Sequence, residues 1–232
     1  MSAGWGTQLG SRLGLQQLQQ LLQSVHGVEA EPVERFLVSA EERERLAPGS
    51  SPDEALLLRG GPVACVGELS VGLFLSDEVL AQLGRSHREP WSGRRLSRFC
   101  VAAEGVSHFL YLSHRAQAGR QVSMLELEAQ AELDKYLCVL MQLWATGRRS
   151  ASTELRRNLF GRWTPRQGLS VQEGERYRLA SALAAAAARV LEARYVVAGR
   201  LDGLLREVRR LFRLSGGEKL SAFAAGGEAW AA

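Results

Sequence analysis

Two periods of apolar and polar residues run along this 232-residue chain, and each predicts a different kind of element. Residues 11–25 place leucines and a valine at helical spacing opposite a row of glutamines, which predicts an amphipathic helix packed on the core or on a partner. Residues 33–75 contain short β-favouring runs between segments rich in proline and glycine, which predicts a small, mainly antiparallel sheet. The runs cover residues 35–39, 54–59, 63–66 and 68–75. In the last of them every second residue is apolar, as a half-buried strand requires.

Helical periodicity dominates the rest of the chain. A short helix begins after Ser76, and a polar, basic loop separates it from two central helices within residues 98–144. A break rich in small and basic residues at 147–152 precedes another short helix. Ser170 begins a long helix, because Ser170 and Glu173 have the spacing of a capping box.

The C-terminal part completes the predicted architecture. Gly199 ends or kinks the long helix, residues 201–212 continue helically, and the small, glycine-rich residues 214–232 are predicted to be disordered. The fold class is therefore α+β, with an N-terminal helix and small sheet followed by a mostly helical C-terminal region. We expect an α+β core with the central helix pair in residues 1–146, a basic helical region packed on that core in residues 147–213, and the disordered tail.

Composition and charge narrow the class of protein. No run approaches the roughly 18 apolar residues that cross a bilayer, and no signal peptide is recognisable, so we expect a cytosolic protein without a membrane span. Three widely spaced cysteines predict reduced thiols rather than a disulfide framework or a zinc site. Arginine greatly outnumbers lysine, which with the richness in alanine is typical of a GC-rich bacterial genome.

Charge is distributed unevenly along the chain. Residues 1–146 carry 13 basic and 17 acidic side chains, whereas residues 147–213 carry 15 basic and 6 acidic ones. This asymmetry indicates either an anionic partner for the C-terminal part or two halves that attract each other.

Glu104 and His108 are the candidate residues for chemistry. They are four residues apart in a predicted helix and so share a face, where a carboxylate and an imidazole can bind one metal ion or move a proton. This face lies opposite the main apolar stripe, beside Tyr111 and Arg115, which predicts that it is half-buried. The alternative is a hydrogen-bonded pair with no further role. The other histidines stand alone in the sequence and are assigned no role: His26, His87 and His114.

Acidic residues of the second central helix offer further ligands. Ser123 and Glu126 have capping spacing, so Glu126 has a structural explanation. Glu128 and Glu132 share a polar face with Lys135, which is typical of a solvated face with an i,i+3 ion pair. If the two central helices cross with these faces together, Glu128 or Glu132 would supply a third ligand to one divalent metal ion.

The order of elements resembles that of the minimal zincin peptidases. The segment AAEGVSHFLYL resembles their HExxH helix, and LEAQAELDKYL resembles the later helix that carries a glutamate. When Glu104 is aligned with the family's catalytic glutamate, Ala103 and Ser107 stand where the two metal-binding histidines should be, and His108 falls one residue late. Because zinc is not held when two ligands are missing, the resemblance implies a relative without peptidase activity.

A basic stripe lies near the end of the chain. Its members recur at three- and four-residue spacing and could bind phosphate groups: Arg206, Arg209, Arg210 and Arg213. No recognised nucleic-acid motif accompanies them, so a solvated or intramolecular basic face is the alternative.

The sequence leaves three functions open. We expect a non-catalytic regulatory protein that binds another protein. The alternative is a metal-dependent hydrolase that uses Glu104 and His108. The third is a nucleic-acid-binding protein that uses the arginine stripe.

Overall fold

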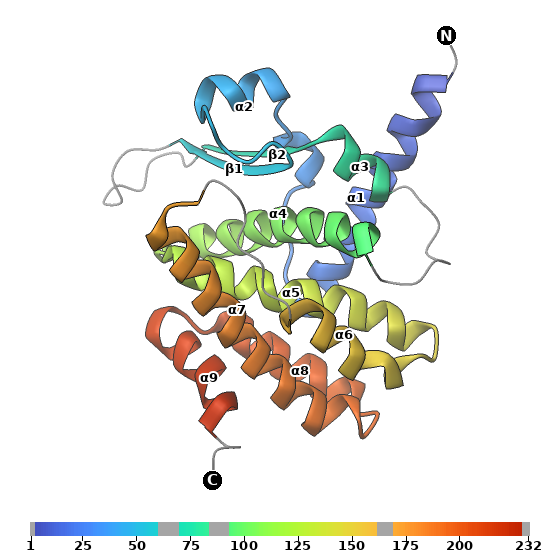
Figure 1. Ribbon diagram of the computed structural model, residues 1–232, viewed down its shortest axis with the longest axis vertical. Coiled ribbons are helices and arrows are strands. Elements are labelled where there is room, and N and C mark those ends of the chain that lie inside the picture. The colour runs from blue at the N-terminus through green and yellow to red at the C-terminus, as the bar shows by residue number, and fades with distance from the viewer. Residues whose placement is uncertain (1–2, 60–69, 84–92, 162–168, 229–232) are drawn as a thin grey trace. The chain divides into compact units, whose positions relative to one another are not determined.

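A computed structural model describes most of the chain (Figure 1), and the described residues are 3–59, 70–83, 93–161 and 169–228. These residues are mostly helical and include one two-stranded antiparallel sheet, which confirms the α+β class. The chain divides into two compact units. Unit 1 comprises Met1–Ser24 and Val28–Gln121, and unit 2 comprises Val25–Gly27 and Val122–Ala232. The division therefore falls between the central helices, whereas the sequence pattern placed a boundary after residue 146.

Helix α1 (Ala3–His26) begins in unit 1, and its last turn belongs to unit 2. The predicted amphipathic helix is thus confirmed and is longer than residues 11–25. Its row of glutamines is not wholly in solvent, because the Gln19 side chain is buried. Gln19 donates to the carbonyl of Glu31 at 2.7 Å and accepts from the amide of Val33 at 2.9 Å. These two bonds hold the chain that follows α1 against the helix.

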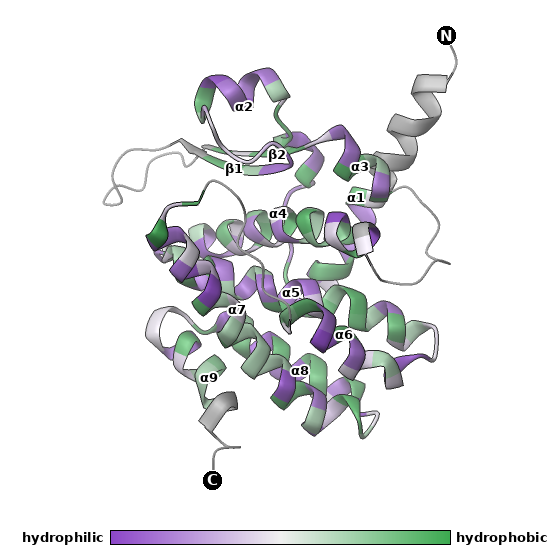
Figure 2. Cartoon of the chain, in the orientation of Figure 1, coloured by the Kyte–Doolittle hydropathy of each residue, from purple (hydrophilic) through white to green (hydrophobic). Residues whose placement is uncertain are grey.

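The strand predicted over residues 35–39 is wrong. Val33–Phe36 forms a 3-10 helix (η1), in which the Arg35 amide donates to the carbonyl of Pro32 at 3.1 Å. Only a single parallel bridge follows, from Leu37 to Leu73. Helix α2 (Ala40–Leu46) comes next and is polar over most of its length (Figure 2).

Strands β1 (Glu54–Arg59) and β2 (Ser70–Leu75) pair antiparallel, as predicted, with Leu56 opposite Leu73. The strand predicted over 63–66 lies outside the described residues. The sheet is buried on two faces rather than half-buried, because Leu73 and Leu75 contact helix α4 while another cluster fills the opposite face. That cluster consists of Ala55, Leu57 and Phe74 with Val38 and Ala47.

Two helices complete unit 1. Helix α3 (Asp77–Leu83) begins after Ser76, whose hydroxyl accepts from the amide of Val79 at 3.4 Å, as predicted. Helix α4 (Gly93–Gln117) packs against α3 and both strands. The α4 helix is therefore the element around which unit 1 is organised.

Unit 2 is built on helix α5 (Met124–Ala145), which begins at the predicted cap, Ser123. Helix α7 (Val171–Leu191) packs against α5 and begins with the predicted capping box of Ser170 and Glu173. Between them lie the 3-10 helix η2 (Arg149–Ala151) and helix α6 (Ser152–Phe160). A π-helical segment, η3 (Glu192–Val196), extends α7, and helix α8 (Leu201–Arg213) follows. The turn between them uses Gly199, whose φ of 66° favours glycine.

Helix α9 (Gly216–Glu228) forms within the tail that the sequence predicted to be disordered over residues 214–232, and residues 229–232 lie outside the described residues. This helix packs against α7, and the side chains of Lys219 and Phe223 are fully buried. The Lys219 ammonium lies 5.4 Å from the ring centroid of Phe212 and 5.9 Å from that of Phe223. Tertiary packing of these two side chains overrides the low helix propensity of the surrounding glycines.

Replacing Phe223 with alanine is expected to lower the free energy of unfolding by about 3–5 kcal/mol, because a buried aromatic ring leaves a cavity. Urea denaturation followed by circular dichroism measures the change. Ser221→Ala is the matched control on the exposed side of α9 and should change the free energy by less than about 0.5 kcal/mol. Equal stability of Phe223→Ala and wild type would show that α9 does not pack in solution.

Two remaining predictions concern membrane-spanning helices and the cysteines. None of the helices in the described ranges has the length and apolar character needed to cross a membrane. Cys138 is buried and Cys100 is half-buried, and within the described residues neither forms a disulfide. Cys65 lies outside the described residues.

Candidate functional site

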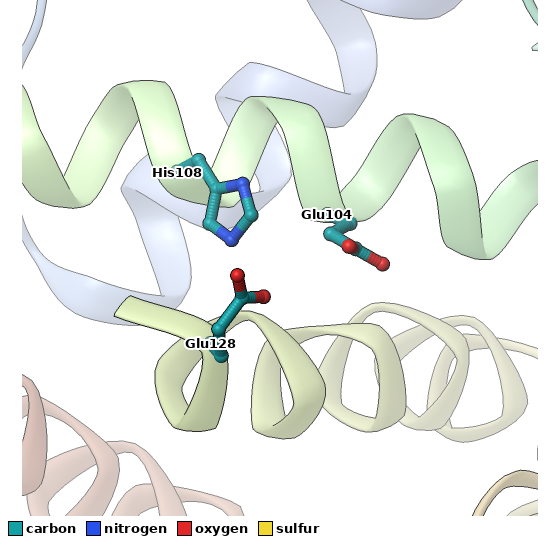
Figure 3. A group of neighbouring side chains, drawn as sticks. All are labelled: Glu104, His108 and Glu128. Atoms are coloured by element: carbon teal, nitrogen blue, oxygen red, sulfur yellow. The ribbon is translucent and has the colours of Figure 1, made fainter. Parts of the chain in front are cut away.

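Helix α4 presents Glu104 and His108 one turn apart on the same side (Figure 3). Both are more deeply buried than the sequence pattern predicted, with exposed fractions of 2% for Glu104 and 5% for His108. Tyr111 and Arg115 continue the same side of the helix and are also buried. This side of α4 is therefore an interior polar surface rather than a half-solvated one.

Gly105 lies between the two candidates and lets the sheet approach α4 closely. A Cβ atom at Gly105 would lie 3.0 Å from Leu73 Cδ1, and 3.2 Å from both Leu75 Cδ2 and Glu54 Cγ. Such distances are tighter than ordinary van der Waals contact, so a larger residue would push the strands away. The absence of a side chain here places the first residue of β1 beside His108.

Glu54 is the site residue that sequence reasoning missed. Its side chain is buried, and its Oε1 lies 3.7 Å from Nδ1 of His108. The sequence contains a signal for it, since Glu54 and Leu56 have the same parity and must point to the same face of β1. A glutamate on the apolar face of a strand is unusual and indicates a specific partner.

The three side chains Glu54, Glu104 and His108 thus give unit 1 a buried group of two carboxylates and one imidazole. Burying carboxylates is costly unless hydrogen bonds, opposite charge or a metal ion compensate. Oxygen and imidazole ligands together suit manganese, iron and zinc. The chemistry that this group supports is metal binding or the movement of a proton between His108 and a carboxylate.

In unit 2, α5 carries the further ligands that the sequence suggested. Glu128, the third side chain in Figure 3, is buried, so the solvated face predicted for it is wrong. Glu132 is more exposed and accepts from Lys135 Nζ at 2.7 Å, which confirms the predicted i,i+3 pair. Like Glu104 and His108, Glu128 offers a ligand atom of a type that metal ions bind.

The sequence suggested that His26 is isolated, but the structure places it in a buried network in unit 2. Its Nε2 lies 2.8 Å from Asp134 Oδ1, and both side chains are fully buried. Gln130 Nε2 donates to the same oxygen at 2.8 Å. The His26 ring also stacks on Phe212 with centroids 4.0 Å apart. These contacts attach the last turn of α1 to α5 and α8.

Two arginines of the predicted basic stripe bind backbone carbonyls at the end of α1. Arg209 Nε donates to the carbonyl of Val25 at 3.3 Å. Arg213 donates to His26 at 3.3 Å and to Gly27 at 3.0 Å. The last carbonyls of a helix lack partners within it, so these arginines act as a C-terminal cap supplied by α8.

The other two arginines of the stripe differ from each other. Arg210 forms two hydrogen bonds to Glu207, at 3.0 and 2.7 Å. These bonds hold the pKa of the Glu207 carboxyl below its ordinary value. Arg206 is exposed. The structure therefore gives three of the four arginines an intramolecular role, in agreement with the alternative left open by the sequence.

A second buried carboxylate network surrounds Glu192 in the π-helical segment. Glu192 accepts hydrogen bonds from Ser152 at 2.7 Å, Thr153 at 3.0 Å and Arg156 at 2.7 Å. The buried phenol of Tyr136 lies nearby, and its pKa is raised above the ordinary value by burial and then by the charge of Glu192. Glu192 thus has three hydrogen-bond donors, and all three belong to α6. The network therefore joins α6 to the segment that extends α7.

Comparison with known proteins assigns no family: no family model, curated protein or solved structure matches this chain. The resemblance to minimal zincin peptidases therefore stays a prediction. Helix α4 carries Ala103 and Ser107 at the positions of the two zincin histidines, and both are buried. Any metal site on α4 must consequently use a ligand set different from that of the peptidases.

Proposed function

We propose that this protein binds one divalent metal ion through Glu104 and His108 of α4. The observation that carries the proposal is the burial of Glu104 and His108 one turn apart on the same side of α4. A divalent cation offsets the cost of burying carboxylates and uses both residue types as ligands. Carboxylate and imidazole ligands together favour manganese, iron or zinc.

The sequence predicts a third ligand from α5, either Glu128 or Glu132, and this stays a prediction. Glu128 is the one that we test first, because its side chain is buried, whereas Glu132 is paired with Lys135.

Metal-dependent hydrolysis is the second candidate function. A metal ion held by three or fewer protein ligands would leave a coordination position for a water molecule, which is the arrangement of catalytic sites rather than of closed structural ones. If the protein is a hydrolase, variants that lose the metal lose activity to the same extent. The protein-interaction role predicted from the charge asymmetry and the nucleic-acid role stay predictions, and the internal contacts of Arg209, Arg210 and Arg213 disfavour the latter.

Calorimetric titration of the EDTA-treated protein with Mn²⁺ and Zn²⁺ tests the ligand set. We expect Glu104→Gln and Glu128→Gln each to weaken binding by more than about 100-fold, beyond the loss typical of an outer-shell residue. Both substitutions keep the shape of the side chain and remove its charge.

Glu132→Gln is the matched control, because it makes the same change on the same helix without touching the proposed ligands. Its affinity should equal that of wild type. Weakening by Glu132→Gln in place of Glu128→Gln would move the third ligand to Glu132. Unchanged affinity in both Glu104→Gln and Glu128→Gln would refute the proposal.

A further inference from the structure

We infer that Glu54 is a positioning residue for His108. Its carboxylate accepts the Nδ1–H group of the imidazole, holds the ring in the neutral Nδ1–H tautomer and so makes Nε2 the atom available to a ligand. The inference deepens the proposed function and rests on it for the consequence that Nε2 binds metal. The contact between Glu54 and His108 itself lies wholly within unit 1.

The position of the Glu54 carboxylate carries the argument. Oε1 lies 3.7 Å from Nδ1 of His108, and both side chains are more than nine-tenths buried. Within the described residues this oxygen is buried and accepts no hydrogen bond. A buried carboxylate oxygen without a donor is costly, and the nearby imidazole nitrogen is the group that can supply one.

Hydrogen bonds on both sides of Glu54 fix its backbone and so limit where its carboxylate can lie. Glu54 pairs with Leu75 across the sheet, and the preceding carbonyl, of Asp53, accepts from the Ser76 amide at 2.9 Å. The side chain then lies over Gly105, whose missing Cβ leaves room for the Glu54 Cγ atom. For Nδ1 to donate to the carboxylate, the distance of 3.7 Å must shorten to the roughly 2.7–3.2 Å of a hydrogen bond.

The chemistry of the imidazole gives this contact a consequence. In a neutral ring one nitrogen carries the hydrogen and the other carries the lone pair. An ionised carboxylate only accepts, so the nitrogen that faces it must be the donor, and the lone pair then lies on Nε2. The opposite tautomer would place the Nδ1 lone pair against a buried negative charge. Carboxylates that orient metal-binding histidines in this way also raise their basicity, and losing them typically costs about 10- to 100-fold in metal affinity.

Long-range ¹H–¹⁵N correlation spectra of the EDTA-treated, ¹⁵N-histidine-labelled protein test the inference without any metal. The His108 signal is assigned by its loss in His108→Ala among the four histidines of the chain. In wild type we expect a protonated Nδ1 and a pyridine-type Nε2. In Glu54→Leu, which puts an apolar side chain of similar size in place of the carboxylate and so removes the acceptor, we expect this preference to be lost. Glu54→Gln, which keeps an acceptor oxygen, should restore it at least in part.

Metal titration of the same variants completes the test. Glu54→Leu should bind Mn²⁺ or Zn²⁺ about 10- to 100-fold more weakly than wild type, and Glu54→Gln should lose less. A pyridine-type Nδ1 in wild type would overturn the inference, and so would an unchanged His108 tautomer in Glu54→Leu. If wild type binds metal, equal metal affinity of Glu54→Leu and wild type would also overturn it. If wild type binds no metal but shows the expected tautomer and its loss in Glu54→Leu, the positioning of His108 stands and the proposed function fails.

Discussion

Asp134→Ala is expected to lower the free energy of unfolding by about 3–5 kcal/mol, as is typical when one partner of a fully buried pair is removed. Asp134 Oδ1 is 2.8 Å from His26 Nε2 and receives a second hydrogen bond from Gln130. Alanine would leave both buried donors without this acceptor, and each unsatisfied group costs a further desolvation penalty. Urea denaturation followed by circular dichroism measures the difference.

Asp134→Asn separates hydrogen bonding from charge at the same site. Asparagine keeps an acceptor oxygen for His26, so its cost should be smaller than that of alanine. Asp202→Ala removes an exposed aspartate from α8 and is the control for a surface change. If Asp134→Ala and Asp202→Ala were equally stable, the buried pair would not exist in solution.

His108→Ala is expected to abolish stoichiometric metal binding, which is the largest functional effect that we predict. The variant removes the imidazole that the proposed site contains and leaves Glu104 as the proposed ligand on α4. His108→Gln fills more of the space of the imidazole than alanine does, so it is less prone to misfold. It should also lose the metal. His114→Ala is the matched control, because it removes a histidine six residues later on α4. Retention of the metal by His108→Ala would exclude His108 as a ligand.

The sequence predicted most helices because their signals are local. Ser170 with Glu173 and Ser123 with Glu126 place a cap and its partner within four residues, and both helices begin where these pairs indicate. The failed prediction over α9 has the opposite cause. The order of that segment comes from burial of Lys219 and Phe223 among distant residues, whereas its composition is that of a flexible tail.

The candidate site was predictable in part. Periodicity showed that Glu104 and His108 share a face of α4, but it could not show what covers that face. Covering it depends on how the sheet approaches Gly105, which is a tertiary property. The same limit hid the His26–Asp134 pair, whose members are 108 residues apart. The alternation of side chains along β1 could have predicted that Glu54 points toward the site, if the face of β1 that packs on α4 had been known.

Metal content of the purified, untagged wild-type protein tests the central claim most directly. Elemental analysis by mass spectrometry should find about one manganese, iron or zinc ion per chain, as expected for a single site with carboxylate and imidazole ligands. The ion should be absent from His108→Ala and present in His114→Ala. Wild-type protein that carries no such metal, even after incubation with Mn²⁺ and Zn²⁺ and removal of the excess, would contradict the account and leave Glu104 and His108 as structural residues.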